Sequence, residues 1–564
     1  MPTTASEPGR RKSLPIRWTW GRAPDESLKA LAADLEAGRV PGDAGLVKRG
    51  DRRAVWALPD VSGGVLLKHF RVRGWEPLLF VVRPSRAAAE YRSAAQLERL
   101  GVATPAPLGF GERRRGGMLV EAWSLARLVP DASTLGEALG RAAASGDEEA
   151  IARWAASAMC TVAALHRLPV LHRDLHANNL LLGPDGALLV IDLHSMRRVS
   201  GPSRQQRLEN LARLVFSMRA AVDLRDAGAL AAEYSAVRGE PDEALAADLA
   251  AALDDFERSY VEGRTARCLV DSTLFTAERL HDGRVYRRRE YSIERLRADL
   301  LRHGQTVRAS GPALLGSTPR ARVTCVDDEG GGRIVKEYLR AGRFPRLRHV
   351  LRRGRARTAW VAARRLDVIG LPTPQALALI ERDDGSAALV TRRIEGAVTL
   401  RTWLATLGDD ARPAERRPLA AAVGHVVGRL ARAGLRHDDL STKNWLVADE
   451  PPPALRDRRD AGAPPRPGVL LIDLDNLRTV PRHDARSLVR MLTQIADVPA
   501  GVTRTDRQRF VRAFERAAGR PLPPEVAREA LEGARHRAAR RAELDRRRSA
   551  TVGSAPAPPV NPTR

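Results

Sequence analysis

Lysine is scarce in this chain although positive charge is not. Arginine and lysine together number 94 in 564 residues and give a formal net charge of +26, but only six of them are lysines. The lysines are Lys12, Lys29, Lys48, Lys68, Lys336 and Lys443. The arginine excess has two interpretations. Either it reflects codon usage in a GC-rich genome, or it serves to attract an anionic partner such as a membrane surface, a phosphorylated glycolipid or a nucleic acid.

Cysteines, aromatic residues and long apolar runs are also few. Three cysteines lie far apart without metal-site spacing, which excludes a disulfide framework and indicates a reducing cytoplasm. Aromatic residues make up 4%, and no nucleic-acid-binding motif is present, so we expect no nucleic acid partner. Apolar runs such as 78–82 are far too short to span a membrane, and the N-terminus has no signal-peptide core. We therefore expect a cytoplasmic protein, at most peripheral to the inner face of the membrane.

Four blocks of sequence occur twice in the same order. A strand-like block, "GGVLLKHF", carries Lys68 and returns as "GGRIVKEY" with Lys336. A helical pattern follows each block and ends in Gly and then Thr-Pro, which stops a helix. Next come the loops "HRDLHANN" and "HDDLSTKN", each followed by an apolar run that ends in Ile-Asp-Leu, and last an amphipathic helix at 207–218 and at 483–495. The sequence therefore contains an internal duplication whose copies each begin with strands and continue with helices.

The duplication predicts a two-domain organisation. The expected segments are a disordered basic N-terminus at 1–24, a first domain at 25–275, a linker or helix at 276–304, a second domain at 305–548 and a disordered tail at 549–564. A Pro-rich, charged insert at 449–468 lengthens a turn of the second copy and is expected on the surface.

The repeated loop has the residues of a phosphoryl-transfer site. Asp174 and Asn179 lie five positions apart, and Asp192 ends an apolar strand, where a carboxylate is costly unless it meets a cation or donors. Two carboxylates and an amide oxygen form a site that Mg²⁺ accepts together with phosphates. A polar capping turn would explain one such loop, but two copies, each preceded by a strand lysine, favour the functional reading. A lysine ammonium is a compact charge, unlike the guanidinium that this chain uses elsewhere, so the placement of scarce lysines at equivalent positions also favours a functional role.

These motifs resemble those of protein kinases. "HRDLHANN" matches the pattern H-R-D-L-x-x-x-N, and "IDL" stands where kinases carry D-F-G. The chain therefore resembles two protein-kinase-like bilobal domains in tandem, an α+β fold with a small β-rich lobe and a larger helical lobe in each domain. The blocks around "SRAAAEYRSAAQLERLGVATPAPL" and the loop most resemble bacterial lipopolysaccharide core kinases, which phosphorylate Kdo or heptose sugars. The resemblance covers about 40–260 well and 310–520 more loosely.

The resemblance implies ATP and Mg²⁺ as cofactors and assigns roles by position. In the first copy, Lys68 is the strand lysine, Glu90 its ion-pair partner, Asp174 the catalytic base, and Asn179 and Asp192 the Mg²⁺ ligands. Glu90 taken alone is an ordinary helix glutamate, and its role depends on this context. The matching residues of the second copy are Lys336, Asp439, Asn444 and Asp473.

The second copy departs from the kinase pattern. Alignment on the Thr-Pro pairs places Ala359 opposite Glu90, and Asp438 replaces the arginine of the loop. Neither copy has a G-x-G-x-x-G turn; the segments 48–58 and 316–326 are the nearest candidates. We therefore hypothesise that the first domain carries most or all of the activity and that the second is degenerate or regulatory.

Several functions agree with these features. The leading one is an ATP- and Mg²⁺-dependent kinase that phosphorylates a sugar hydroxyl of lipopolysaccharide core or a related envelope glycolipid. The alternatives are a kinase for a small molecule of the aminoglycoside or choline type, and a tandem pseudokinase scaffold that binds nucleotide. Only about a dozen residues separate Asp192 from the next helix, which argues against a peptide substrate. The basic run 343–357 is either a solvated surface or a contact to anionic lipid.

Overall fold

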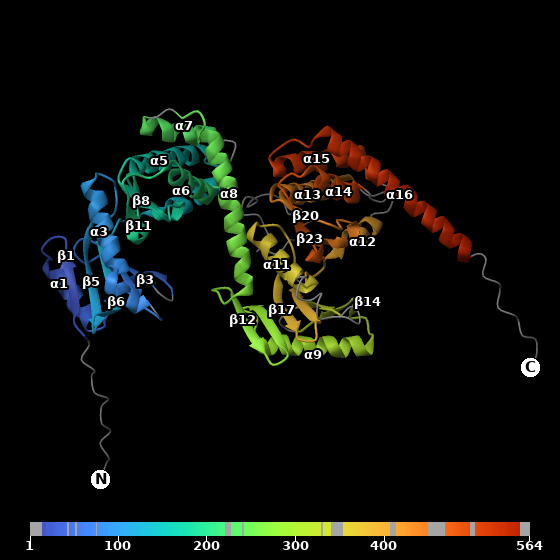
Figure 1. Ribbon diagram of the computed structural model, residues 1–564, viewed down its shortest axis with the longest axis horizontal. Helices are drawn as coiled ribbons and strands as arrows, with labels where there is room; N and C mark the ends of the chain where they lie inside the picture. Colours follow the sequence, from blue (N-terminus) through green and yellow to red (C-terminus); the bar gives the residue numbers. More distant parts are fainter. Residues whose placement is uncertain are drawn as a thin grey trace, which may run out of the picture. The chain divides into compact units, whose positions relative to one another are not determined.

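The computed structural model describes residues 14–552 except 42–43, 51–52, 75, 220–226, 240–241, 329–330, 340–353, 407–412, 449–467 and 497–501. The chain divides into two compact units, residues 1–257 (unit 1) and 258–564 (unit 2), which are described separately (Figure 1). Most of the basic run 343–357, nearly all of the insert 449–468, and the ends 1–13 and 553–564 lie outside the described residues.

Unit 1 begins with a six-stranded antiparallel sheet in the order β1-β5-β6-β4-β3-β2. Its strands are β1 (Ile16–Trp20), β2 (Gly45–Arg49), β3 (Arg53–Leu58), β4 (Val65–Arg71), β5 (Pro107–Arg115) and β6 (Met118–Arg127). Side chains alternate between the two faces of a strand. In β4, Val65 and Leu67 are therefore buried in an apolar core, while Lys68 points to the other face. That face is packed by α3 (Arg86–Arg99), which the Ser85 side chain caps at its N-terminus.

The rest of unit 1 is mainly helical. It contains α4 (Leu135–Ser145), α5 (Glu148–His166), α6 (Arg204–Met218), α7 (Ala227–Arg238) and α8 (Leu245–Ala266), the last of which runs across the boundary between the units. Between α5 and α6 lie short strands and turns: β8 (Val170–His172), η1 (Ala177–Asn179), β9 (Leu180–Leu182), β10 (Leu188–Val190), η2 (Leu193–Ser195) and β11 (Met196–Arg198). A single apolar core joins these helices to the short strands and so fixes the loops that carry the Asp and Asn motifs.

Unit 2 repeats this plan with a seven-stranded sheet in the order β12-β13-β17-β18-β16-β15-β14. The strands are β12 (Phe275–Leu280), β13 (Gly283–Arg288), β14 (Leu314–Thr318), β15 (Ala321–Val326), β16 (Arg333–Tyr338), β17 (Ala376–Arg382) and β18 (Ala387–Arg392). α11 (Arg355–Val368) corresponds to α3. The later helices are α12 (Leu400–Thr406), α13 (Pro413–Arg432), α14 (Ala485–Ala496), α15 (Arg504–Ala518) and α16 (Pro524–Val552).

The structure differs from the sequence prediction in the two segments that precede the lobes. Strand β1 lies within 1–24, where disorder was expected, and pairs with β5; β13 lies within the expected linker 276–304 and pairs in the same way with β17. A helix follows each strand, α1 (Glu26–Glu36) in unit 1 and α9 (Ile293–Ala309) in unit 2. The duplication is therefore longer than the sequence comparison indicated.

The two helices are hard to align because the buried positions differ in chemistry. Helix α1 buries Leu28, Leu31 and Leu35 in an apolar core. Helix α9 buries Leu296, Asp299 and His303 at the same spacing, and Asp299 forms an ion pair with the buried Arg333. The spacing of the buried positions is therefore kept, but polar residues replace two of the three leucines. The expected tail at 549–564 also begins inside a helix, because α16 continues to Val552.

Candidate active site

The loop of unit 1 is held by hydrogen bonds between motif residues. The side-chain amide of Asn179 donates to the carbonyl of Asp174 over 2.8 Å, and the N–H of Ile191 donates to the carbonyl of Asn179 over 3.0 Å. These bonds tie the loop after β8 to the strand that leads into Asp192. The nitrogen of Asn179 is thereby committed to the loop, so its oxygen is the atom that can ligate a cation.

His172 is part of this framework rather than an acid or base. It is fully buried, and burial lowers its pKa despite the hydrogen bond to the carbonyl of Ile191. Its Nδ1 accepts from the N–H of Asp174 over 3.3 Å, so the proton is on Nε2, which donates to the Ile191 carbonyl over 3.2 Å. The neutral ring therefore fixes the backbone on both sides of the loop.

Asp192 has an unusual backbone and a charged environment. Its φ is 60°, in the left-handed region that few non-glycine residues adopt, and this turns its carboxylate toward the sheet. Its carboxylate accepts from His194 Nδ1 over 2.8 Å and from Arg53 Nη1 of β3 over 2.9 Å. Burial alone would raise the pKa of Asp192, but the His194 hydrogen bond and the charges of Lys68 and Arg53 lower it well below its ordinary value. Asp192 is therefore ionised at neutral pH, as a cation ligand must be.

Lys68 and Glu90 form an ion pair between β4 and α3. Their side chains are 12% and 10% exposed, so the pair is largely shielded from water. The charge of Lys68 also acts on Asp192. The structure thus brings together the strand lysine, the helix glutamate and the loop aspartate that the sequence selected.

Asp174 differs from these groups because its side chain is 57% exposed. Arg213 of α6 lies 3.3 Å from its Oδ1 and also donates to the carbonyl of Arg173. His176 Nε2 is 3.7 Å from Oδ2. An accessible carboxylate held beside the loop can meet the hydroxyl of an acceptor, as a general base must.

Unit 2 has a similar framework of hydrogen bonds, although the carbonyl that its histidine contacts lies one residue later than in unit 1. Asn444 donates to the carbonyl of Asp439 over 2.8 Å, and His437 lies 3.2 Å from the carbonyl of Asp473. The φ of Asp473 is 61°, as at Asp192. The Thr-Pro motif belongs to this framework too: Thr104 donates to the Val190 carbonyl and Thr373 to the Leu471 carbonyl, both over 2.8 Å.

The charges around the second lysine are arranged differently. Ala359 is buried at the position of Glu90, so α11 offers no carboxylate there, as the alignment predicted. Lys336 instead forms an ion pair with Asp473 itself. Asp439 is partly exposed and has Lys443 at 3.1 Å. Burial raises the pKa of Asp439, but bonds from Ser441 and Lys443 outweigh this effect and lower it.

Two kinds of site residue escaped the sequence analysis. Arg53 contacts Asp192 across 139 positions of sequence, and only its place in the segment considered as a phosphate-covering turn pointed to it. Arg213 carried no motif at all, and only its contact with Asp174 identifies it. His194 lies two residues after Asp192 and makes a local hydrogen bond to its carboxylate.

The residues of unit 1 fit a Mg²⁺-nucleotide. The set offers an ionised carboxylate, an amide oxygen and an accessible second carboxylate, which are hard oxygen donors of the kind that Mg²⁺ takes together with phosphates and water. The described residues contain no cluster of three or more His, Cys, Asp or Glu that could hold a metal by themselves, so phosphate and water would complete the coordination. Lys68 and Arg53 supply the positive charge that phosphates need.

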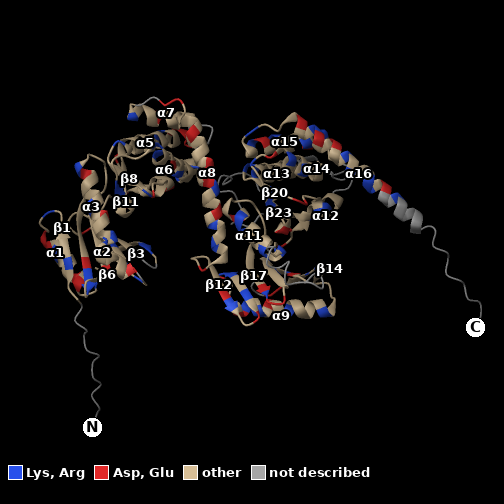
Figure 2. Ribbon diagram, in the orientation of Figure 1, with Lys and Arg blue, Asp and Glu red and all other residues tan. Residues whose placement is uncertain are grey.

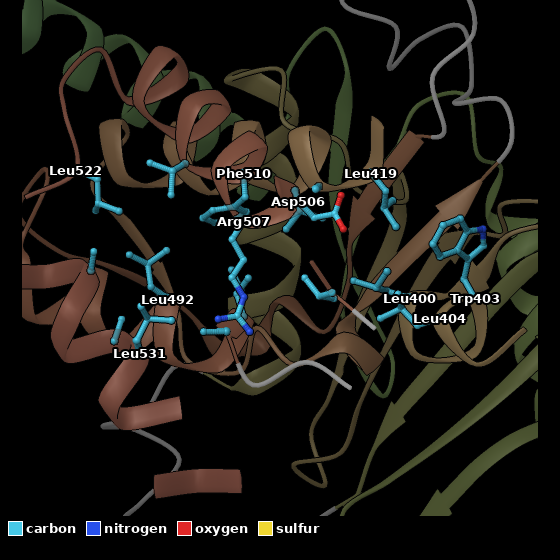
Figure 3. A pocket seen from close by; sticks show the side chains of 18 residues that line it. Leu400, Trp403, Leu404, Leu419, Leu492, Asp506, Arg507, Phe510, Leu522 and Leu531 are labelled. Carbon is cyan, nitrogen blue, oxygen red and sulfur yellow. The ribbon is translucent and has the colours of Figure 1, made fainter. Parts of the chain in front are cut away.

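A separate apolar cavity of about 220 Å³ lies in the helical part of unit 2 (Figure 3). Its lining comes from α12 to α16 and includes Leu400, Trp403, Leu492 and Phe510; Asp506 and Arg507 are the charged residues of that lining. None of the lysine and aspartate residues of the motifs lines this cavity. The cavity is therefore distinct from the motif residues of unit 2.

Basic and acidic residues both occur along α8 and along the described part of α16 (Figure 2). Many arginines form ion pairs within their own unit, such as Arg204 with Asp242 and Asp248, or Arg333 with Asp299 and Asp328. Among the described helices, none is long and apolar enough to cross a bilayer.

A bilobal unit with a strand lysine and an Asp/Asn loop before a second aspartate is a protein-kinase-like fold, and this chain contains two of them in tandem. The model of the lipopolysaccharide kinase (Kdo/WaaP) family matches residues 52–234 and again 331–514. The chain belongs to this family, and it is a kinase.

Comparison with individual proteins adds the following. A solved structure of WaaP in complex with acyl carrier protein is 25% identical to this chain, with a TM-score of 0.28. The match covers 43% of this chain and 90% of that one. No curated protein matches the chain.

Proposed function

We propose that this protein transfers the γ-phosphate of ATP, with Mg²⁺, to a sugar hydroxyl of lipopolysaccharide core or of a related envelope glycolipid, and that unit 1 performs the transfer. The observation that carries the proposal is the joint arrangement of the Lys68–Glu90 pair, the ionised Asp192 and the accessible Asp174 in one unit. Family membership supports the glycolipid as the class of acceptor.

Each residue then has a defined task. Asp174 accepts the proton of the attacking hydroxyl, and Arg213 holds this carboxylate beside the loop. Glu90 fixes the Lys68 ammonium so that it can meet phosphate oxygens. Asp192 and Asn179 would hold Mg²⁺, which neutralises the charge of the phosphates during transfer. Arg53 must release Asp192 when a cation binds there, and it is then free to contact phosphate.

The test is transfer of labelled γ-phosphate into a cell-envelope glycolipid extract by the full chain. Wild type is compared with Asp174→Ala and with the matched variant Asp439→Ala. We expect label in the glycolipid from wild type and from Asp439→Ala but none from Asp174→Ala. Equal loss in both variants would contradict the assignment to unit 1. Turnover of ATP without labelled glycolipid would point to a soluble acceptor, and a lack of any turnover to the nucleotide-binding scaffold.

We further propose a cytoplasmic location with peripheral contact to an anionic membrane, motivated by the net charge of +26. Binding to vesicles that contain anionic lipid should be lost at high salt, because salt screens charges at a surface. Binding that persists at high salt, or none at low salt, would contradict this contact.

A further inference from the structure

Asp475 is a buried carboxylate in unit 2 that the assigned motifs do not use. It lies two residues after Asp473, and its side chain is 0% exposed. Lys336 Nζ is 3.8 Å and Arg355 Nη2 2.7 Å from its Oδ2. Neither carboxylate oxygen has a hydrogen-bond partner among the described residues, so these two contacts are ion pairs. A carboxylate is costly to bury, so its position beside two cations calls for an explanation.

The corresponding residues of unit 1 show what has changed. His194 stands at the position of Asp475, and Glu90 stands at the position of Ala359. Arg86, which corresponds to Arg355, forms its ion pair with Glu76 over 2.7 Å and not with the loop. In unit 1 the helix therefore supplies the carboxylate near the lysine. In unit 2 the loop supplies the carboxylate and the helix supplies a cation.

We propose that Asp475 replaces Glu90 as the residue that positions the strand lysine, so that unit 2 retains a Mg²⁺-nucleotide site of altered design. Lys336 contacts two carboxylates, Asp473 and Asp475. If Asp473 serves as a cation ligand, Asp475 remains to hold the lysine. Arg355 joins α11 to the same loop and thus takes over the connection between helix and loop. This goes beyond the proposed function, which assigns the transfer reaction to unit 1 only.

Nucleotide binding by the full chain tests the proposal without relying on activity. Asp192→Asn removes the carboxylate from the two proposed cation ligands of unit 1, so that binding of a fluorescent ATP analogue with Mg²⁺ reports on unit 2. Adding Asp475→Asn should weaken this binding by roughly tenfold or more, the size of effect typical of residues that orient the groups of a metal site. Unchanged affinity, or no binding to the Asp192→Asn protein at all, would overturn the proposal.

A second pair of variants protects the test against a folding defect. Ala359→Glu with Asp475→His rebuilds in unit 2 the arrangement of unit 1, and Ala359→Gln with Asp475→His adds the same volume without the charge. The thermal midpoint of each protein is measured alongside. We expect the glutamate variant to bind the nucleotide at least about tenfold more tightly than the glutamine variant. Equal affinities would overturn the proposal even if Asp475→Asn does not fold.

Labelling of the glycolipid by the Asp475→Asn protein with an intact unit 1 separates the two proposals. Normal labelling together with weakened nucleotide binding in the Asp192→Asn background supports both. If wild type does not label the glycolipid either, this result contradicts the proposed function only. The nucleotide-binding result then still tests the role of Asp475.

Discussion

Replacing Glu90 by glutamine should destabilise unit 1 because it leaves the Lys68 ammonium buried without its partner. Loss of one member of a buried ion pair costs about 3–5 kcal/mol, compared with at most about 1 kcal/mol at a surface. The exposures of 12% and 10% place this pair close to the buried case. The charge of Asp192 also acts on Lys68 and offsets part of the loss, so we expect a cost of about 2–3 kcal/mol.

Urea unfolding followed by tryptophan fluorescence measures this cost. Six of the nine tryptophans lie in unit 1, so its transition dominates the signal. Four proteins complete the cycle: wild type, Glu90→Gln, Lys68→Met and the double variant. We expect the double variant to be more stable than Glu90→Gln, because it removes both charges together.

Glu98→Gln is the matched control, since Glu98 is an exposed residue of the same helix. It should change the free energy of unfolding by no more than about 0.5 kcal/mol. A cost below about 1 kcal/mol for Glu90→Gln, or a double variant as unstable as the sum of the single variants, would refute the buried pair.

Three further predictions concern stability and the metal. Burial lowers the pKa of His166 to about 4 from 6.5, so the unfolded chain takes up a proton there that the folded chain does not. The stability that the neutral His166 contributes is fully present above pH 6.5, and the free energy of unfolding should fall by about 3 kcal/mol as the pH falls to 4. Urea unfolding at several pH values should show a weaker pH dependence of this free energy for His166→Gln than for wild type. Thr104→Val removes the hydrogen bond to the Val190 carbonyl and should lower the stability of unit 1 by about 1 kcal/mol, with Thr373→Val doing the same in unit 2; a loss well below about 0.5 kcal/mol would contradict an anchoring role. Chelation of divalent cations should abolish labelling of the glycolipid and added Mg²⁺ should restore it, while labelling that survives chelation would contradict a cation at Asp192.

The sequence predicted the fold class, and it selected candidate residues that the structure brings together, because both depend on local patterns. The strand around Lys68, the Asp174 loop and the apolar run before Asp192 each occupy a short stretch with a recognisable period. The pairing of Lys68 with Glu90 came from the resemblance, and the structure brings these residues together.

Contacts that join distant segments could not be predicted in this way. Arg53 is the first residue of β3, which pairs with the strand of Lys68, and it contacts Asp192 from there. No pattern within β3 identifies it. Strand β1 is short and lies at the edge of the sheet, and its place there depends on pairing with β5, which follows about 90 residues later. The partner of Lys336 is a similar case, because comparison by position finds Ala359 and misses a carboxylate that lies on another element.

The two units separate the parts of the motif that build the loop from those that perform chemistry. Both units keep the buried histidine, the Asn-to-carbonyl bond and the threonine anchor, with nearly equal distances. Breaking any of these would leave a buried polar group unpaired, which costs about 1–3 kcal/mol whether or not the unit is catalytic. A match to the loop motif therefore indicates a kinase-like fold and does not by itself indicate catalytic activity. The charges around Lys68 and Lys336 do differ between the units. Substitutions of Glu90 and Asp475, rather than of the loop framework, will therefore test whether each unit binds nucleotide and transfers phosphate.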